Sequence, residues 1–193
     1  TQIRSSAASD VYKRQELTNS LKAKAKDAVF LATGQTGICI SGNGIPLDAY
    51  KVDYASGAVE EMVLKYKNNE YLIIEGQGSL LNPGSTATLP LMRGSCPTAL
   101  VLCHRLGLRV VESETKILIP PLEQVISLNE QLVTGLNSFP TAKVKAVALD
   151  TRGYDHASAI NEISKMEDKL NLPVTDPVRF SAKKIANALI YLN

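Results

Sequence analysis

The sequence has little that would mark a secreted, membrane-spanning or nucleic-acid-binding protein. Its three cysteines, Cys39, Cys96 and Cys103, form no Cys-x-x-Cys pair, which favours a reducing cytoplasm over a disulfide framework. No apolar run approaches the length of a membrane span, and no signal-peptide hydrophobic region is recognisable. The 21 basic and 19 acidic residues give a formal charge of +2 without a basic patch. We therefore expect no nucleic acid and no membrane as a partner.

Several enzyme motifs are missing as well. No His/Cys/Asp/Glu cluster has zinc-ligand spacing, and there is no G-x-S-x-G elbow. The chain has neither the G-x-x-x-x-G-K-[ST] loop of an independent nucleotide triphosphatase nor a G-x-G-x-x-G fingerprint after a strand. The chain has 193 residues, of which 45% are hydrophobic and 21% charged, and this composition is typical of a soluble globular domain.

The most informative stretch is Tyr71-Leu-Ile-Ile-Glu-Gly-Gln-Gly-Ser79. Four apolar residues lead into one carboxylate, Glu75, and then into two glycines, which predicts a buried strand that ends in a tight turn. In a parallel sheet this turn lies at the carboxyl edge, where ligands bind. Gly76 and Gly78 let a ligand approach the backbone. A plain strand end with a solvated Glu75 is the alternative.

A second turn of this kind comes after the apolar stretch Ala28–Ala32. Thr33-Gly-Gln-Thr-Gly37 is rich in glycine and threonine, and such a turn can offer several backbone N–H groups to an anion. Two strand-to-glycine turns in one chain strengthen the prediction of a binding site.

Five short apolar stretches alternate with helical patterns along the chain. The predicted strands are 28–32, 71–74, 99–103, 142–149 and 172–175, and the predicted helices are 16–26, 48–67, 122–136, 158–170 and 181–192. Each strand ends in polar or glycine residues, which is typical of an α/β fold with a parallel sheet and a site along its carboxyl edge. The candidate groups at strand ends are Gln35, Thr36, Glu75, Gln77, His104, Asp150, Arg152, Asp176 and Arg179.

Five segments together resemble the C-terminal domain of the DgcN-type family, which was long classed as a domain of unknown function. They are 33–37, 52–60, 75–79, 101–104 and 172–179. The resemblance covers residues 16–193 and implies a single P-loop NTPase-like α/β domain of the dethiobiotin synthetase-like group, a three-layer parallel sheet with helices on both faces. It also implies a D-glutamate N-acetyltransferase of D-amino-acid catabolism, with acetyl-CoA as co-substrate. Members carry a small N-terminal domain and a Walker-A-like loop before the helix predicted at Glu16, and neither is found here. The resemblance therefore implies that this chain is the truncated C-terminal domain of a longer protein, to which we expect the activity to belong.

The resemblance also suggests roles for individual residues. Glu75 matches the acid of the Glu-Gly-Gln-Gly-Ser motif, and we expect it to remove a proton from the substrate ammonium. The residues expected to line the cofactor and substrate crevice are Thr33, Gly34, Gln35, Thr36, Gly37, Gly76, Gln77, Gly78 and Ser79. The residues expected to bind a small acidic amino acid are Arg93, His104, Asp176 and Arg179. An arginine would clamp the substrate carboxylate, and we further expect a homo-oligomer.

Two other functions stay open. One is an ATP-dependent kinase or ligase-like enzyme acting on a small carboxylate, in which Glu75 would hold Mg²⁺. The other is a non-catalytic nucleotide-binding domain. Residues 1–15 join poorly to the rest of the chain and resemble a spurious end of translated environmental fragments. We therefore predict that they are non-native; a native, poorly ordered terminus is the alternative.

Overall fold

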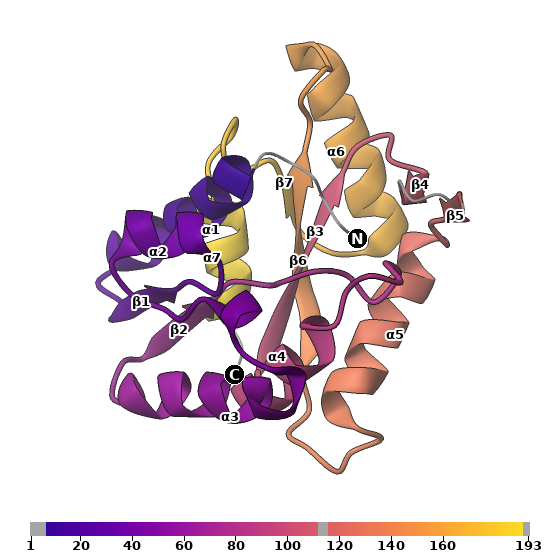
Figure 1. Cartoon of the computed structure of the whole chain (residues 1–193). Helices are drawn as coiled ribbons and strands as arrows, with labels where there is room; N and C mark the ends of the chain where they lie inside the picture. The colour runs from indigo at the N-terminus through magenta and orange to yellow at the C-terminus, as the bar shows by residue number, and fades with distance from the viewer. Residues whose placement is uncertain (1–6, 112–115, 191–193) are drawn as a thin grey trace. The chain divides into compact units, whose positions relative to one another are not determined.

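The computed structural model describes residues 7–111 and 116–190, with side chains from residue 12 onward (Figure 1). The first six residues of the predicted non-native segment and the last two of the helix predicted over 181–192 lie outside this part. The chain divides into an N-terminal unit, Thr1–Cys96, and a C-terminal unit, Pro97–Asn193. Each contains parallel strands flanked by helices, which confirms the α/β class. That residues 16–193 act as a single domain stays a prediction.

The N-terminal unit contains two strands and their flanking helices. In chain order these are α1 (Ala7–Lys22), β1 (Ala28–Leu31), α2 (Gln35–Ser41), the 3-10 helix η1 (Leu47–Ala49), α3 (Val52–Lys65), β2 (Tyr71–Ile74) and α4 (Thr88–Ser95). The strands β1 and β2 pair in parallel, with Leu31 opposite Ile74. Both strands therefore end at the same edge, where Thr33 and Glu75 follow them.

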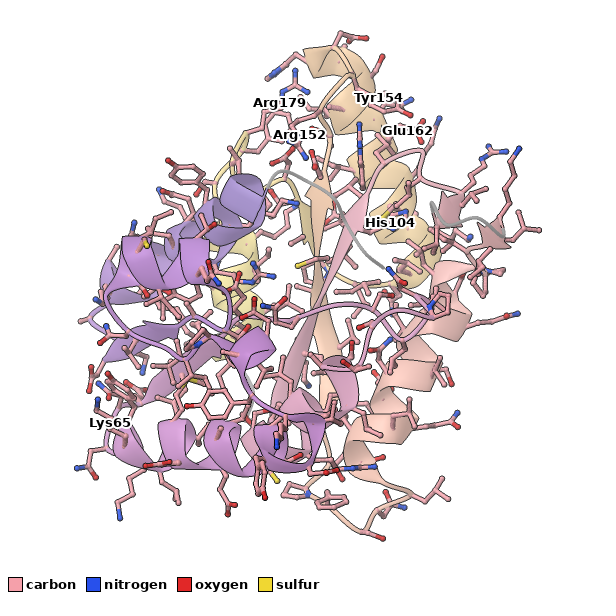
Figure 2. All side chains as sticks on the ribbon, viewed as in Figure 1. Lys65, His104, Arg152, Tyr154, Glu162 and Arg179 are labelled. Atoms are coloured by element: carbon pink, nitrogen blue, oxygen red, sulfur yellow. The ribbon has the colours of Figure 1, made fainter. Side chains whose placement is uncertain are left out.

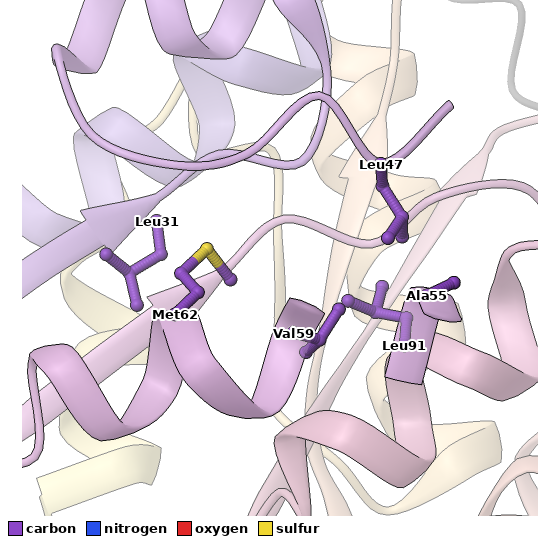
Figure 3. Close-up of a cluster of buried hydrophobic side chains, with 6 residues drawn as sticks. All are labelled: Leu31, Leu47, Ala55, Val59, Met62 and Leu91. Carbon is purple, nitrogen blue, oxygen red and sulfur yellow. The ribbon is translucent and has the colours of Figure 1, made fainter. Parts of the chain in front are cut away.

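Alternate residues of β1 and β2 pack against helices on opposite faces of this sheet. The cluster on one face, drawn in Figure 3, consists of Leu31, Leu47, Ala55, Val59, Met62 and Leu91, with Leu72 and Ile74 packed against it. Phe30 and Ala32 point the other way and pack with Ile38 of α2. The helix α3 forms because Ala55, Val59 and Met62 recur at helical spacing on its buried side.

The C-terminal unit contains a three-stranded parallel sheet in the order β3-β6-β7. Its elements are β3 (Ala99–Arg105), β4 (Val110–Val111), β5 (Ile117–Leu118), α5 (Leu122–Thr134), β6 (Lys143–Asp150), α6 (His156–Leu170), β7 (Val174–Thr175) and α7 (Lys183–Ile190). Val147 and Leu149 of the central strand pack with Ile163 of α6 and Val174. The short strands β4 and β5 form a separate antiparallel pair.

Several elements differ from the sequence prediction, and the helix predicted over 48–67 is observed as η1 and α3. The first helix begins at Ala7 instead of Glu16, and β3 extends to Arg105, so that His104 lies within the strand. Residues 35–41 form the helix α2, although 33–37 was predicted to be a turn. Packing of Ile38 on the sheet outweighs the weak intrinsic helix preference of these residues. Within the described residues, no helix is both long and apolar enough to cross a lipid bilayer.

Candidate functional site

The carboxylate of Glu75 is fixed at the carboxyl end of β2. Its residue is 7% exposed. Oε2 accepts hydrogen bonds from the backbone N–H groups of Thr33, at 2.9 Å, and Gly34, at 3.1 Å. These N–H groups follow the neighbouring parallel strand, because β1 and β2 end side by side. The turn predicted to offer backbone N–H groups to an anion thus offers two of them to the protein's own carboxylate.

Thr33 and Gln77 complete a clamp between the two turns. The hydroxyl of Thr33, which is 0% exposed, donates to the carbonyl oxygen of Glu75 at 3.0 Å. The side-chain amide of Gln77 donates to the carbonyl oxygen of Thr33 at 2.9 Å. Both side chains were predicted to bind a cofactor, yet these polar groups are engaged within the protein. What they provide is the position of Glu75.

Gly37 is the residue of α2 that lies against the carboxylate. A Cβ at this position would lie 2.6 Å from Oε2 of Glu75 and 2.7 Å from the Cβ of Ala32. Both separations are shorter than non-bonded atoms accept, so a side chain here must displace Glu75 or the sheet. Gly37 was predicted to line the cofactor and substrate crevice, which stays a prediction; the structure shows that it lies against Glu75.

Further hydrogen bonds order the loop after Glu75. Thr88 at the start of α4 donates to the carbonyl oxygen of Gln77 at 2.9 Å, and the N–H of Ser79 donates to Oγ of Ser85 at 3.1 Å. Gly78 has a positive φ of 68°, which favours glycine. A Cβ on Gly76 would meet nothing within 4 Å. The outer side of Gly76 is therefore open to a ligand, while Gly78 serves the turn.

The second oxygen of Glu75 faces Arg14, a residue that the sequence did not mark as part of the site. Nη1 of Arg14 lies 3.1 Å from Oε1, and Nη2 donates to the carbonyl oxygen of Gly76 at 3.4 Å. Arg14 belongs to the stretch 1–15, which is predicted to be non-native, and no motif there pointed to a site. That residues 1–15 are non-native stays a prediction. If they are native, the ion pair between Arg14 and Glu75 belongs to the native site.

The remaining residues predicted for the cofactor lie at the surface of the same unit. Gln35 and Thr36 are exposed in the first turn of α2, and Gly34 is half-buried. Arg93, which was predicted to bind the substrate, lies half-buried in the last turn of α4. No group of three or more His, Cys, Asp or Glu residues is gathered to hold a metal ion within residues 12–111 and 116–190.

Three of the predicted substrate-binding residues belong to the C-terminal unit. His104 is buried within β3, opposite Leu149 in the strand register. Asp176 follows β7 and is 4% exposed. One of its oxygens accepts from the N–H and the hydroxyl of Thr151, at 3.0 and 2.7 Å. The other accepts from the N–H groups of Val178 and Arg179, both at 3.1 Å. Asp176 thus joins two turns, and its predicted contact with the substrate stays a prediction.

Arg179 is placed by the turn that Asp176 organises. Its Nη1 donates to the backbone carbonyl of Tyr154 at 2.9 Å and to Oγ1 of Thr151 at 3.3 Å. In the same turn Asp155 caps α6, and hydrogen bonds from the hydroxyl and N–H of Ser158 hold the pKa of its carboxyl below the ordinary value. Figure 2 shows Arg152, Tyr154 and Arg179 grouped at one end of this unit.

Comparison with known proteins places these features in a family. A family model described as "Domain of unknown function (DUF1611_C) P-loop domain" matches residues 11–186. A protein of Tritonibacter scottomollicae named D-glutamate N-acetyltransferase is 30% identical over 93% of this chain and 54% of its own length. One of the same name from Pseudoalteromonas sp is 32% identical over 88% of this chain and 51% of its own.

A solved structure shares the fold. The crystal structure of a DUF1611 family protein from Anabaena variabilis superposes with a TM-score of 0.90 at 46% identity, over 95% of this chain and 54% of that one. The chain thus spans about half the length of the relatives that it matches.

Proposed function

Because the chain belongs to the DUF1611 family, as its five motifs predicted, we propose that it forms part of an enzyme that transfers an acetyl group to the amino group of D-glutamate. The observation that carries this proposal is the name shared by two relatives, which match 93% and 88% of the chain at 30% and 32% identity. The clamped carboxylate of Glu75 supports it, because amine acylation needs a group that accepts a proton.

Glu75 acts as the general base in this proposal. The substrate ammonium loses a proton to Oε1, directly or through one water, and the free amine attacks the acetyl thioester. The new C–N bond forms as the C–S bond breaks, and the thiol leaves after it takes up a proton. Oε2 does not take part, since two N–H groups hold it. Fixing one oxygen keeps the other in place for the transfer.

The co-substrate in this proposal is acetyl-CoA. It would approach the exposed first turn of α2, where Gly34, Gln35 and Thr36 lie, and the open side of Gly76. Substrate carboxylates would be held by arginine, the residue whose planar fork matches them best. In this proposal Arg93, in the last turn of α4, would supply it. The substrate contacts predicted for Asp176 and Arg179 stay predictions.

An ATP-dependent kinase or ligase acting on a small carboxylate is the second candidate. The family description as a P-loop domain favours it, since P-loops bind nucleotide phosphates. In that reaction Glu75 would bind Mg²⁺ through Oε1, a role that fits a hard oxygen ligand. The two candidates differ in one respect that is simple to measure, which is the need for ATP.

The test uses the full-length protein that carries this domain. It is incubated with acetyl-CoA and D-glutamate, with and without ATP and Mg²⁺, and N-acetyl-D-glutamate is measured by mass spectrometry. We expect product without ATP, and a loss of at least about a hundredfold in rate for Glu75→Gln. The matched control is Asp168→Asn, an exposed acid of α6, which should keep full activity. An active Glu75→Gln would refute the role of Glu75, and ADP without acetylated product would favour the second candidate.

A further inference from the structure

The guanidinium of Arg14 is bound by two acceptors at the carboxyl end of β2. Nη1 donates to Oε1 of Glu75 at 3.1 Å, and Nη2 donates to the carbonyl oxygen of Gly76 at 3.4 Å. The side chains of Arg14 and Glu75 are 15% and 10% exposed, so both charges lie largely out of water. One carboxylate oxygen and the carbonyl oxygen of the following residue thus hold a single cation between them.

The protein fixes both acceptors without help from Arg14. Thr33 and Gly34 hold Oε2 of Glu75 through their N–H groups, which sets the direction of Oε1. The hydroxyl of Thr33 donates to the carbonyl oxygen of Glu75 at 3.0 Å and so orients the peptide group before Gly76. A Cβ on Gly76 would meet nothing within 4 Å, so a ligand has room there. The two acceptors are therefore preorganised for a cation.

Arg14 reaches these acceptors because of its position on α1. Leu17, Thr18 and Leu21 follow it at helical spacing on the same side of the helix, and they are 6%, 1% and 0% exposed. Packing of that side against α2 and β1 fixes the direction of Arg14. Without Arg14, Glu75 would be a buried carboxylate with an unpaired charge, and such a charge is costly. Removal of Arg14 should therefore leave a site that attracts another cation.

We propose that Oε1 of Glu75 and the carbonyl oxygen of Gly76 form a binding site for a primary ammonium group, and that Arg14 blocks this site in the 193-residue chain. An ionised carboxylate and a carbonyl are acceptors only, whereas an ammonium group supplies three N–H donors and a positive charge. The second acceptor limits how the ammonium can turn at Oε1. The choice of an amino acid as ligand rests on the proposed function, in which Glu75 takes a proton from the substrate ammonium.

The origin of residues 1–15 changes only the role of Arg14. If these residues are native, Arg14 is an internal inhibitor that an amine substrate must displace. If they are non-native, as the sequence predicts, the guanidinium marks the place of a ligand that the native protein binds. In either case the acceptors belong to Glu75 and Gly76, and loss of Arg14 should strengthen the binding of amines.

The experiment compares the 193-residue chain with its Arg14→Ala variant, which keeps a strong helix former in α1. The backbone N–H resonances of Gly34 and Gly76 are followed by NMR during titration, at constant ionic strength, with methylammonium, D-glutamate and glutarate. We expect methylammonium and D-glutamate to bind Arg14→Ala at least about tenfold more tightly than the unchanged chain, because a charge-assisted pair no longer competes. Glutarate, which is D-glutamate without its ammonium group, should show no such gain.

Two further variants test the acceptors themselves. Lys22→Ala removes an exposed cation from the last turn of the same helix and should leave the affinity for methylammonium unchanged. Glu75→Gln added to Arg14→Ala should cancel the gain, since it removes the charge that binds the ammonium. Shifts with methylammonium that do not saturate in Arg14→Ala would overturn the proposal, and so would an equal gain in Lys22→Ala.

Methylammonium separates the ammonium site from the proposed function. Tighter binding of methylammonium by Arg14→Ala, with no gain for D-glutamate, would support the site and remove D-glutamate as its ligand. A gain for both ligands, together with a full-length protein that acetylates nothing, would keep the site and reject the acetyltransferase.

Discussion

The two units of this protein have the same hydrogen-bonding arrangement at the carboxyl ends of their parallel strands. In the N-terminal unit, Glu75 after β2 binds the N–H of Thr33, which follows the neighbouring strand β1. In the C-terminal unit, Asp176 after β7 binds the N–H of Thr151, which follows the neighbouring strand β6. In both units, a buried carboxylate that follows one strand accepts a hydrogen bond from a threonine that follows the adjacent parallel strand.

The two carboxylates differ in what is left for a ligand. Asp176 accepts four hydrogen bonds from its own unit, two on each oxygen. Glu75 accepts two backbone hydrogen bonds on Oε2, while Oε1 faces the single side chain of Arg14. The two carboxylates therefore differ in their number of protein donors, which is four for Asp176 and three for Glu75. That Glu75 is the reactive one stays a prediction.

Replacing each carboxylate by its amide should produce the largest contrast. In Asp176→Asn an NH₂ group must face two N–H or O–H donors, so we expect a loss of about 3 kcal/mol in the free energy of unfolding. Glu75→Gln can keep its carbonyl oxygen toward Thr33 and Gly34, and should lose about 1 kcal/mol. Urea denaturation followed by circular dichroism measures both. Equal losses would show that the donor count does not distinguish the two sites.

A side chain at Gly37 should displace the carboxylate of Glu75 and disrupt its hydrogen bonds to Thr33 and Gly34. The added methyl group of Gly37→Ala would lie 2.6 Å from Oε2, and we expect a loss of about 1–3 kcal/mol in stability together with loss of acetyl transfer. Gly57→Ala in α3 is the matched control, because a Cβ there meets nothing within 4 Å. It should stabilise the protein by about 0.5–1 kcal/mol. Similar behaviour of the two variants would mean that the contact with Glu75 is unimportant.

Replacing Gln77 tests whether its hydrogen bond to Thr33 serves to position Glu75. Gln77→Ala leaves the carbonyl oxygen of Thr33 without its 2.9 Å donor, so we expect a loss of about 1 kcal/mol. In the full-length enzyme the rate at saturating substrate should fall, with little change in KM, if Gln77 positions Glu75 without touching substrate. Gln131→Ala, which removes an exposed hydrogen bond to Ser127, serves as the control. A raised KM with unchanged rate would instead favour the ligand-binding role first predicted for Gln77.

The sequence predicted the strands of both sites well, because four to eight apolar residues followed by glycine or charge are a local pattern. It placed Glu75 and Asp176 at strand ends, where the structure has them. It did not predict which groups meet. Gln77 and Thr33 are 44 residues apart, and their contact depends on the parallel pairing of β1 and β2, which no local pattern specifies.

Helix α2 and the position of His104 depend on tertiary contacts that the local sequence does not specify. Residues 35–41 have a weak helix preference that tertiary packing overrides. His104 was placed after its strand by one residue, since the apolar run ends at Cys103, but β3 continues through Arg105 beside the last residues of β6. Its predicted substrate contact stays a prediction, as do the ligand contacts of Arg93 and Arg179.

The smallest effect is expected for Glu167 of α6, whose carboxylate binds the N–H of Val174 at the start of β7. Its replacement should change the stability of the fold and the dependence of that stability on pH. Burial alone would raise the pKa of Glu167, but hydrogen bonds from Lys184 and the N–H of Val174, with the charge of Lys184, lower it below 4.5. Because the folded pKa lies below the unfolded value, this stabilisation is present above pH 4.5 and is lost as the pH falls through the folded pKa. We expect Glu167→Gln to cost less than about 1 kcal/mol at pH 7 and to flatten the decline in stability below pH 4.5. Asp168→Asn on the same helix should leave the decline unchanged, and an unaltered slope in Glu167→Gln would show that Glu167 does not contribute to acid unfolding.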